Sequence, residues 1–220
     1  MTEQLQETAT IVEVGPRDGL QNEKTVLTTD QKVALVDALT SCGFRKIEVG
    51  SFVHPILVPQ MADTDEVFRL IERRPSTRYI GLVPNLRGAH RALEAKVDGV
   101  NVVLAASETF NRGNVRMSVD ASVTAFREIA SLVSEQGRDV WLSIATAFGC
   151  PFEGPVKVGE VVRLAEAAAA AGATGVTLAD TTGMANPRQV ADTIRAVRGA
   201  VGDRLHVLLH FHNTRGMALA

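Results

Sequence analysis

Two histidines near the end of the chain have a spacing that suits a metal site. His210 and His212 stand two residues apart in H-F-H-N-T, where a short apolar run ends. Because alternate residues of a β-strand project to the same face, both imidazoles can reach one ion. A single histidine in a strand is more often structural, and we expect that role for His206 at the start of the same run. The pair predicts a divalent-metal site.

A cation and an anion follow the first apolar run. Arg17 and Asp18 lie within V-G-P-R-D-G-L-Q-N-E, between glycines and a proline. If the sheet closes, the Asp18 carboxylate can reach the histidines across its rim, and two imidazoles with one carboxylate suit an ion that also holds a substrate. We expect Mg²⁺ or Mn²⁺, although the same ligands permit Zn²⁺ or Fe²⁺. The planar donor fork of Arg17 suits an oxyanion or an enolate, and a rim salt bridge is the alternative.

Three more polar residues stand where apolar runs end. They are Glu48 in I-E-V-G-S-F, Asn85 in V-P-N-L and Asp180 in L-A-D-T-T-G. Each alone is more often a helix cap or a supporting acceptor than a catalyst. Because all three recur at the ends of strands, we expect them at one rim, where carboxylates can orient a ligand histidine or an arginine.

The elements that must position these residues alternate along the chain. Seven short apolar runs predict strands, and segments of helical period separate most of them. This alternation indicates βα units and a parallel sheet. No G-x-G-x-x-G follows a strand, so we expect a (β/α)8 TIM barrel rather than a doubly wound nucleotide-binding sheet. The predicted strands are Ile11–Val14, Lys46–Val49, Tyr79–Val83, Gly99–Leu104, Val140–Thr146, Gly175–Ala179 and Leu205–His210.

Helix signals support this alternation. Thr28 followed by Gln31 predicts a capping box, and the helix after it is expected to leave Lys32 in solvent. Asn186 and Pro187 predict the cap and first residue of a helix over 188–198. A typical barrel needs about 250 residues, and this chain has 220. We therefore expect residues 1–220 to form a single barrel domain, catalytic but incomplete at its C-terminus, with about seven strands and without the eighth βα unit.

Composition excludes several classes of protein. The net charge of −2 leaves no basic stripe for nucleic acid. The N-terminus has no secretory or mitochondrial signal, and the longest apolar stretch, around 165–173, is too short to cross a membrane, so we expect a cytoplasmic protein without a membrane partner. Cys42 and Cys150 lie far apart, and we expect both to be reduced, buried thiols.

Longer motifs carry a resemblance to a known family. The chain resembles 3-hydroxy-3-methylglutaryl-CoA lyase and its relatives, which are metal-dependent TIM-barrel lyases and synthases. The motifs that carry the resemblance are V-G-P-R-D-G-L-Q-N-E-K (14–24), S-F-V-H-P-x-x-V-P-Q-M-A-D (51–63), V-P-N-L-R-G (83–88), A-A-S-E-T-F (105–110), G-C-P-F-E-G (149–154) and H-F-H-N-T-R-G (210–216).

The resemblance implies cleavage of a 3-hydroxyacyl-CoA into acetyl-CoA and a keto acid, which is acetoacetate in the parent reaction of leucine degradation. It implies that Asp18, His210 and His212 hold the metal and that Arg17 stabilises the enolate of departing acetyl-CoA. The ion would acidify the substrate hydroxyl, and His210 or Asp18 would remove its proton.

The remaining roles follow from the same resemblance. Glu48 and Asp180 would support the site, and Gln21, Lys24 and Asn85 would lie on the side of the acyl-CoA substrate. Dimers in the family make a homodimer a possible assembly.

Some positions depart from the family pattern. Trp141 and Ser143 stand where the typical lyases carry Arg-x-Tyr, and Asn213 stands where Asp is usual. The family's fourth metal ligand, an asparagine, and its loop cysteine are expected beyond residue 220. A relative acting on citramalyl-CoA or on a longer branched hydroxyacyl-CoA is therefore an alternative. A synthase or aldolase of the same superfamily and an inactive, truncated metal-binding scaffold are others, whereas the βα alternation disfavours a non-haem iron oxygenase.

Overall fold

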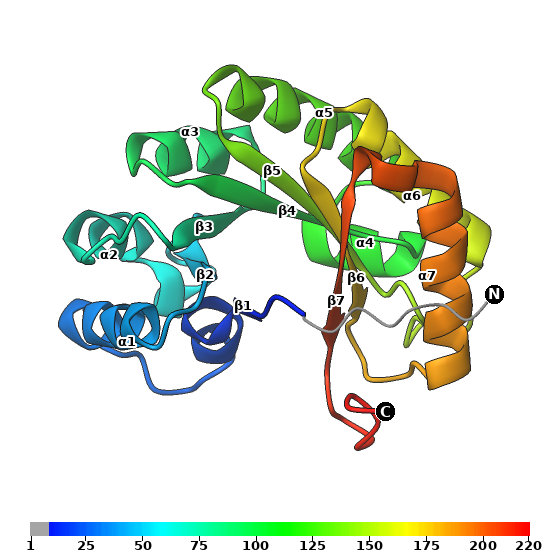
Figure 1. Cartoon of the computed structure of the whole chain (residues 1–220), viewed down its shortest axis with the longest axis horizontal. Coiled ribbons are helices and arrows are strands. Elements are labelled where there is room, and N and C mark those ends of the chain that lie inside the picture. The colour runs from blue at the N-terminus through cyan, green and yellow to red at the C-terminus, as the bar shows by residue number, and fades with distance from the viewer. Residues whose placement is uncertain (1–8) are drawn as a thin grey trace.

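A single parallel sheet organises the protein. The computed structural model describes residues 9–220, and within them seven strands pair in the order β1 to β7 (Figure 1). Each predicted strand is present, and its ends lie within two residues of the predicted ones. The strands are β1 (Val12–Glu13), β2 (Lys46–Ser51), β3 (Arg78–Val83), β4 (Gly99–Ala105), β5 (Asp139–Ala145), β6 (Gly175–Asp180) and β7 (His206–Phe211).

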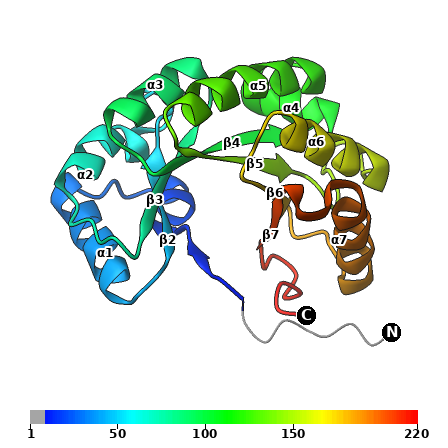
Figure 2. The same cartoon turned by 45° about the horizontal axis from the view of Figure 1, so that its top comes forward.

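The helices cover the outer face of this curved sheet. Figure 2 shows them as an arc around the strands, so that the sheet forms a half-barrel with β1 and β7 at its two edges. This confirms the predicted (β/α) barrel architecture. The helices are α1 (Thr29–Ser41), α2 (Thr64–Leu70), α3 (Leu86–Glu94), α4 (Glu108–Val115), α5 (Val119–Glu135), α6 (Val158–Ala170) and α7 (Pro187–Val201), with short turns of helix at Gly15–Gly19, Pro59–Met61 and Gly202–Arg204.

The hydrophobic core lies between the sheet and the helices. Val102, Leu142 and Ile144 point outward from β4 and β5 and are buried in this core. Their neighbours Asn101 and Ser143 point to the opposite face and line the inner hollow. Because side chains alternate along a strand, the same two strands supply both the core and the polar lining of the hollow.

Helix α1 shows both the strength and the limit of the sequence patterns. The predicted capping box is present: the Thr28 hydroxyl accepts from the Gln31 backbone N–H, and the Gln31 side chain accepts from the Thr28 N–H. The expectation that Lys32 is solvated is wrong. Its side chain is buried because Nζ donates to the Gln60 carbonyl and to the Asp63 carboxylate, which fixes α1 to the loop after β2.

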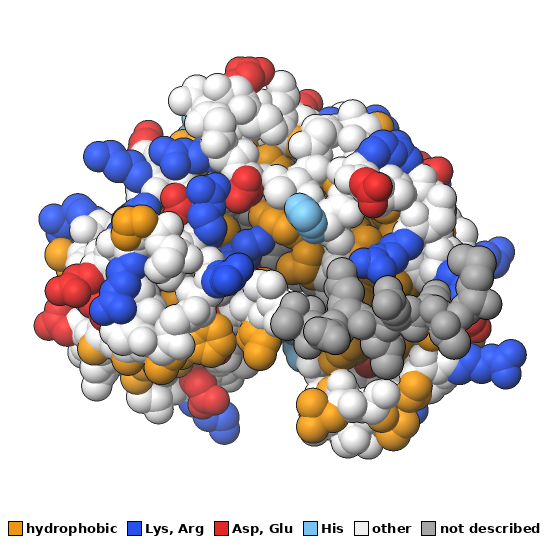
Figure 3. Space-filling model, viewed as in Figure 1, with side chains coloured by type: hydrophobic (Ala, Val, Ile, Leu, Met, Phe, Trp, Pro, Cys, Tyr) orange, Lys and Arg blue, Asp and Glu red, His pale blue; other side chains and the backbone are white. Residues whose placement is uncertain are grey.

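Of the two cysteines expected to be buried, one is buried and the other is exposed. Cys150 is buried as expected, but the expectation of a buried Cys42 is wrong: Cys42 is exposed at the C-cap of α1. No helix within residues 9–220 is both long enough and apolar enough to cross a membrane. On the face seen in Figure 3, basic and acidic side chains lie interspersed over the helices.

Candidate active site

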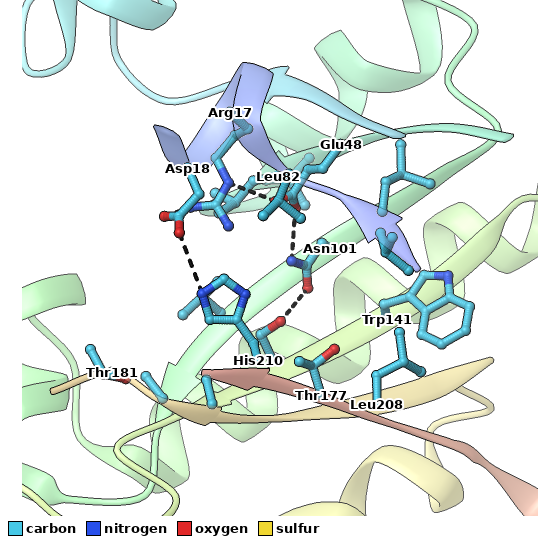
Figure 4. Close-up of a pocket in the computed structure, with 18 of the residues that line it drawn as sticks. Arg17, Asp18, Glu48, Leu82, Asn101, Trp141, Thr177, Thr181, Leu208 and His210 are labelled. Carbon is cyan, nitrogen blue, oxygen red and sulfur yellow. Dashed lines mark hydrogen bonds and ion pairs between the residues drawn. The ribbon is translucent and has the colours of Figure 1, made fainter. Parts of the chain in front are cut away.

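The segment after β1 forms one turn of π-helix, Gly15–Gly19. The backbone N–H of Gly15 donates to the Glu13 carboxylate at 2.6 Å, and a Cβ on Gly15 would lie 2.8 Å from that same oxygen. A larger residue at this position would therefore displace the Glu13 carboxylate from its hydrogen bond. Single π-turns occur frequently at functional sites, and this one aims Arg17 and Asp18 into the hollow of the sheet (Figure 4).

Three side chains from opposite edges of the sheet meet at one point. The His210 and His212 Nε2 atoms are 3.0 Å apart, and they lie 3.3 Å and 3.4 Å from Asp18 Oδ2. Donor atoms at neighbouring corners of an octahedron of about 2.1 Å radius are about 3 Å apart. The triangle formed by the three atoms therefore has the dimensions of one face of a divalent-ion site, and this group could hold a metal ion.

His212 is also in the tautomer that a metal-binding histidine requires. Its Nδ1 lies 2.7 Å from the Thr181 carbonyl oxygen, which can only accept a hydrogen bond. Nδ1 must therefore carry the proton, and the neutral ring leaves the Nε2 lone pair directed at the triangle. A backbone carbonyl that orients a histidine in this way is the usual support of a metal-bound imidazole.

Asp18 is held in its charged form. The pKa of its carboxyl lies well below the usual range, first because His210 donates a hydrogen bond to it and also because Arg17 is close, although partial burial opposes the shift. The carboxylate is therefore available as an anionic ligand at neutral pH.

Arg17 is shared between two carboxylates. Its Nε donates to Glu48 Oε2 at 2.7 Å, and its Nη1 donates to Asp18 Oδ1 at 2.8 Å. Burial acts to lower the pKa of Arg17, but the two carboxylates outweigh it and raise that pKa above its usual value. Arg17 therefore presents a fixed positive charge beside the Asp18–His210–His212 triangle.

The sequence analysis missed Asn101 of this site, and it named Ser143 only as a departure from the family pattern. Asn101 Nδ2 donates to Glu48 Oε1 at 2.8 Å (Figure 4). The Ser143 hydroxyl donates to Asn101 Oδ1 at 2.8 Å. A polar residue in the middle of a buried, otherwise apolar strand costs free energy unless it is hydrogen-bonded. That signal was present in V-N-V-V-L and W-L-S-I, and it could have identified both residues.

Two other predicted site residues, Asp180 and Asn85, form hydrogen bonds with the backbone near their own strands. Asp180 is buried, and its carboxylate accepts from the backbone N–H groups of Met184 and Ala185, so it shapes the loop beside Thr181. Asn85 caps α3 by accepting from the Gly88 N–H at 2.9 Å, and it also lines the hollow.

Gln21, Lys24 and His206 complete the set of predicted residues. Gln21 lines the hollow, and its buried Oε1 has no hydrogen-bond partner among residues 9–220. Lys24 is exposed and lies outside the lining of the hollow. His206 lies at the opposite end of β7 from the triangle and stacks on Trp141 with ring centroids 6.2 Å apart, which agrees with a structural role.

Comparison with known proteins places this arrangement in a family. Residues 8–220 match the HMGL-like family model. The chain is 39% identical over 211 residues to hydroxymethylglutaryl-CoA lyase YngG of Bacillus subtilis and 43% identical over 224 residues to (R)-citramalyl-CoA lyase of Chloroflexus aurantiacus. These matches cover 96% and 97% of the chain and 70% of each relative.

Solved structures agree with this assignment. The structure of the Bacillus subtilis HMG-CoA lyase superposes with a TM-score of 0.93 at 38% identity, over 96% of this chain and 70% of that one. An Acinetobacter HMG-CoA lyase in complex with coenzyme A and 3-methylmalate gives a TM-score of 0.90 at 45% identity, over 94% of this chain and 67% of that one. The chain therefore belongs to the HMGL-like family and is a carbon–carbon lyase.

Proposed function

We propose that this site cleaves a 3-hydroxyacyl-CoA of the 3-hydroxy-3-methylglutaryl type into acetyl-CoA and acetoacetate. The bond between C2 and C3 of the acyl group breaks. The C3 hydroxyl loses its proton and becomes the ketone of the keto acid, and the electron pair of the broken bond passes to C2. The resulting enolate of acetyl-CoA then takes a proton at C2. The observation that carries this proposal is the convergence of Asp18, His210 and His212, with Arg17 beside them.

Three residues would hold a divalent ion, and we propose Mg²⁺ or Mn²⁺. The ligand atoms are Asp18 Oδ2 and the Nε2 atoms of His210 and His212, which have suitable spacing. The His212 tautomer leaves its Nε2 lone pair free, and binding of the ion would displace the proton that His210 Nε2 donates to Asp18. When bound, such an ion acidifies a hydroxyl group and so favours cleavage at neutral pH. The carboxylate and the His212 tautomer support this assignment independently of each other.

Arg17 would stabilise the negative charge that develops on the thioester oxygen. It cannot lose its proton, and its Nε and Nη1 atoms are held by Glu48 and Asp18. A fixed donor directed at a developing enolate lowers the barrier without reorganisation during the reaction. The two candidate bases for the proton of the C3 hydroxyl are Asp18 and His210, which both lie beside the position proposed for the ion.

The acyl-CoA would lie across the rim above the hollow. Gln21 and Asn85 line this hollow, and the unpartnered Gln21 oxygen supports a role in accepting a hydrogen bond from the substrate. We place Lys24 at the outer end of the substrate, where an exposed ammonium can meet a CoA phosphate. Asp180 would act indirectly, through the loop that carries Thr181.

A second substrate is favoured by two observations. The chain is 43% identical to a citramalyl-CoA lyase. Asn101 and Ser143 also give the hollow a polar lining, and Ser143 stands where the resemblance places tyrosine. Citramalyl-CoA carries a carboxylate directly on its hydroxyl carbon, and a polar lining suits that group better than a methylene. Cleavage would then give acetyl-CoA and pyruvate.

One experiment separates these candidates. The protein is incubated with 3-hydroxy-3-methylglutaryl-CoA, with citramalyl-CoA and with a longer branched analogue, each with Mn²⁺ and with excess chelator, and acetyl-CoA and the keto acid are quantified. We expect metal-dependent release of acetyl-CoA from one of the three, and the keto acid identifies the substrate. Ion binding without cleavage of any substrate would favour the inactive scaffold, and condensation of added acetyl-CoA would favour a synthase.

Three wider proposals accompany this function. A cytoplasmic location and a part in leucine breakdown are compatible with a lyase of this type, and relatives include both cytoplasmic and mitochondrial enzymes. A homodimer is proposed as the assembly, and light scattering measures it directly.

A further inference from the structure

We propose that Asn101 and Ser143 are positioning residues, which hold the catalytic arginine through Glu48. The inference rests on the proposed function, because Arg17 matters to catalysis only if an oxyanion or enolate forms beside it. It assigns a role to two side chains from β4 and β5 that lie outside the sequence motifs shared with the lyases.

Four side chains form one continuous chain of hydrogen bonds. It runs from the Ser143 hydroxyl to Asn101, from Asn101 to Glu48 and from Arg17 to Glu48, with donor–acceptor distances of 2.8, 2.8 and 2.7 Å. The exposed fractions of Glu48, Asn101 and Ser143 are 1%, 8% and 9%, so water competes little for these bonds. Such buried networks are worth more than exposed ones, and they fail when one member is left unsatisfied.

The direction of each bond is fixed by Glu48. Its carboxylate only accepts, so the Asn101 amide must turn its NH₂ group towards Glu48 and its oxygen towards Ser143. The Ser143 hydroxyl must then donate. A rotated Asn101 amide would place two oxygen atoms against each other, and the network therefore has one arrangement.

The consequence for Arg17 is geometric. With Oε1 of Glu48 held by Asn101, Oε2 is fixed where it receives Arg17 Nε. Without Asn101, a buried carboxylate oxygen would be unpaired, and Glu48 would relieve the cost by rotating or by taking a proton. Either response loosens Arg17. A loosened arginine still binds the ground state, but it stabilises the developing charge less, so the loss should fall on kcat rather than on KM.

The position of Ser143 adds a second argument. The resemblance places tyrosine there in the typical lyases, and the serine in this chain is short enough to leave the Asn101 carbonyl reachable from β5. In this chain, Asn101 and Ser143 together fix the Arg17–Glu48 pair.

The test uses four variants of the protein, each measured with Mn²⁺ and the preferred substrate. Asn101→Leu and Ser143→Ala remove the network, and we expect kcat to fall about 10-fold to 100-fold for Asn101→Leu and less for Ser143→Ala, with KM changed less than about 3-fold. Asn101→Asp restores a donor only when its new carboxyl is protonated, so the ratio of its kcat to that of the wild type should rise as the pH falls. Ser122→Ala is the control, because Ser122 is buried and hydrogen-bonded to Asn111 on α4.

Two results would overturn the inference. One is wild-type kcat and KM in both Asn101→Leu and Ser143→Ala at temperatures where both are folded. The other is a loss of kcat in Ser122→Ala that matches the loss in Ser143→Ala, because the effect would then follow stability alone.

A readout without substrate separates this inference from the proposed function. The Arg17 Nε–H resonance, assigned from its absence in Arg17→Lys, should exchange slowly with solvent in the wild type and rapidly in Asn101→Leu. If the protein cleaves no acyl-CoA but this loss of protection occurs, the positioning of Arg17 stands and the proposed function fails. Equal protection in both proteins would contradict the positioning role.

Discussion

The Nδ1 atom of His212 lies 2.7 Å from the carbonyl oxygen of Thr181, the first residue after β6. This contact joins the last two strands at the rim and fixes which nitrogen of His212 is a lone-pair donor. The candidate metal site thus depends on a backbone position as well as on three side chains.

Changes to the triangle should lower metal affinity before they alter the fold. We expect His212→Gln and Asp18→Asn each to weaken Mn²⁺ binding at least about 10-fold, because each removes one of three ligands. Isothermal titration with Mn²⁺ measures the effect. His206→Gln is the matched control, since His206 lies on the same strand at its far end. Unchanged affinity in the first two variants would show that the ion, if bound, lies elsewhere.

The pair of Arg17 and Glu48 should dominate the stability of the rim. Arg17→Met removes the cation next to a carboxylate that is 1% exposed, and loss of one partner from a buried ion pair costs about 3–5 kcal/mol. Urea denaturation measures this loss. Arg195→Met is the control, because Arg195 pairs with Asp192 on the exposed side of α7 and surface pairs contribute about 0–1 kcal/mol. Equal losses would mean that Glu48 is neutral or hydrated.

Much of this fold can be read from local patterns. The seven strands are short apolar runs, and the caps at Thr28 and Asn186 depend on residues three positions apart. Such signals survive because strand residues that face the helices must be apolar and helix ends must satisfy their N–H groups. The convergence of Asp18, His210 and His212 was also predictable, because two histidines at alternate positions at the end of an apolar run project to the same side, and the first and last strands of a barrel approach each other.

Features that depend on contacts between distant segments could not be predicted from the sequence. Lys32 appeared to be a solvated helix residue, and only the loop after β2 supplies the Asp63 carboxylate that buries it. Asn101 and Ser143 sit on different strands, and their link appears only when the register of β4 and β5 is known. Asp180 ends a strand as expected, but its carboxylate is used by the loop that follows.

Two glycines should respond to alanine in opposite ways. A Cβ on Gly175 would lie 2.6 Å from the His206 carbonyl oxygen and 2.3 Å from the Trp141 ring, so Gly175→Ala forces neighbours apart and should cost about 1–3 kcal/mol. Gly199 lies exposed within α7, and a Cβ there meets nothing within 4 Å, so Gly199→Ala should stabilise the protein by about 0.5–1 kcal/mol. Thermal denaturation compares them. A destabilised Gly199→Ala would contradict the assigned helix.

Because the Lys46 ammonium is partly buried, the free energy of unfolding should increase with pH in the alkaline range. Its Nζ lies over the Trp141 ring, 3.2 Å from the centroid, and burial lowers the pKa of Lys46 to about 8 from an ordinary value of 10.5. Below about pH 8 the ammonium is charged in both the folded and the unfolded state, and the folded protein carries the full cost of burying it. Between about 8 and 10.5 the unfolded chain binds more protons, so the free energy of unfolding increases with pH.

Replacing Lys46 isolates this contribution. Lys46→Met keeps the stem of the side chain and removes the charge, so at pH 7 it should stabilise the protein by about 1 kcal/mol, which allows for the solvent that the lysine retains and for its contact with the indole. The difference from wild type should shrink as the pH rises through 8 to 10.5. Urea denaturation at pH 7, 8.5 and 10 measures it, with the exposed Lys24→Met as control. A difference that stays constant with pH would show that Lys46 titrates alike in the folded and unfolded states.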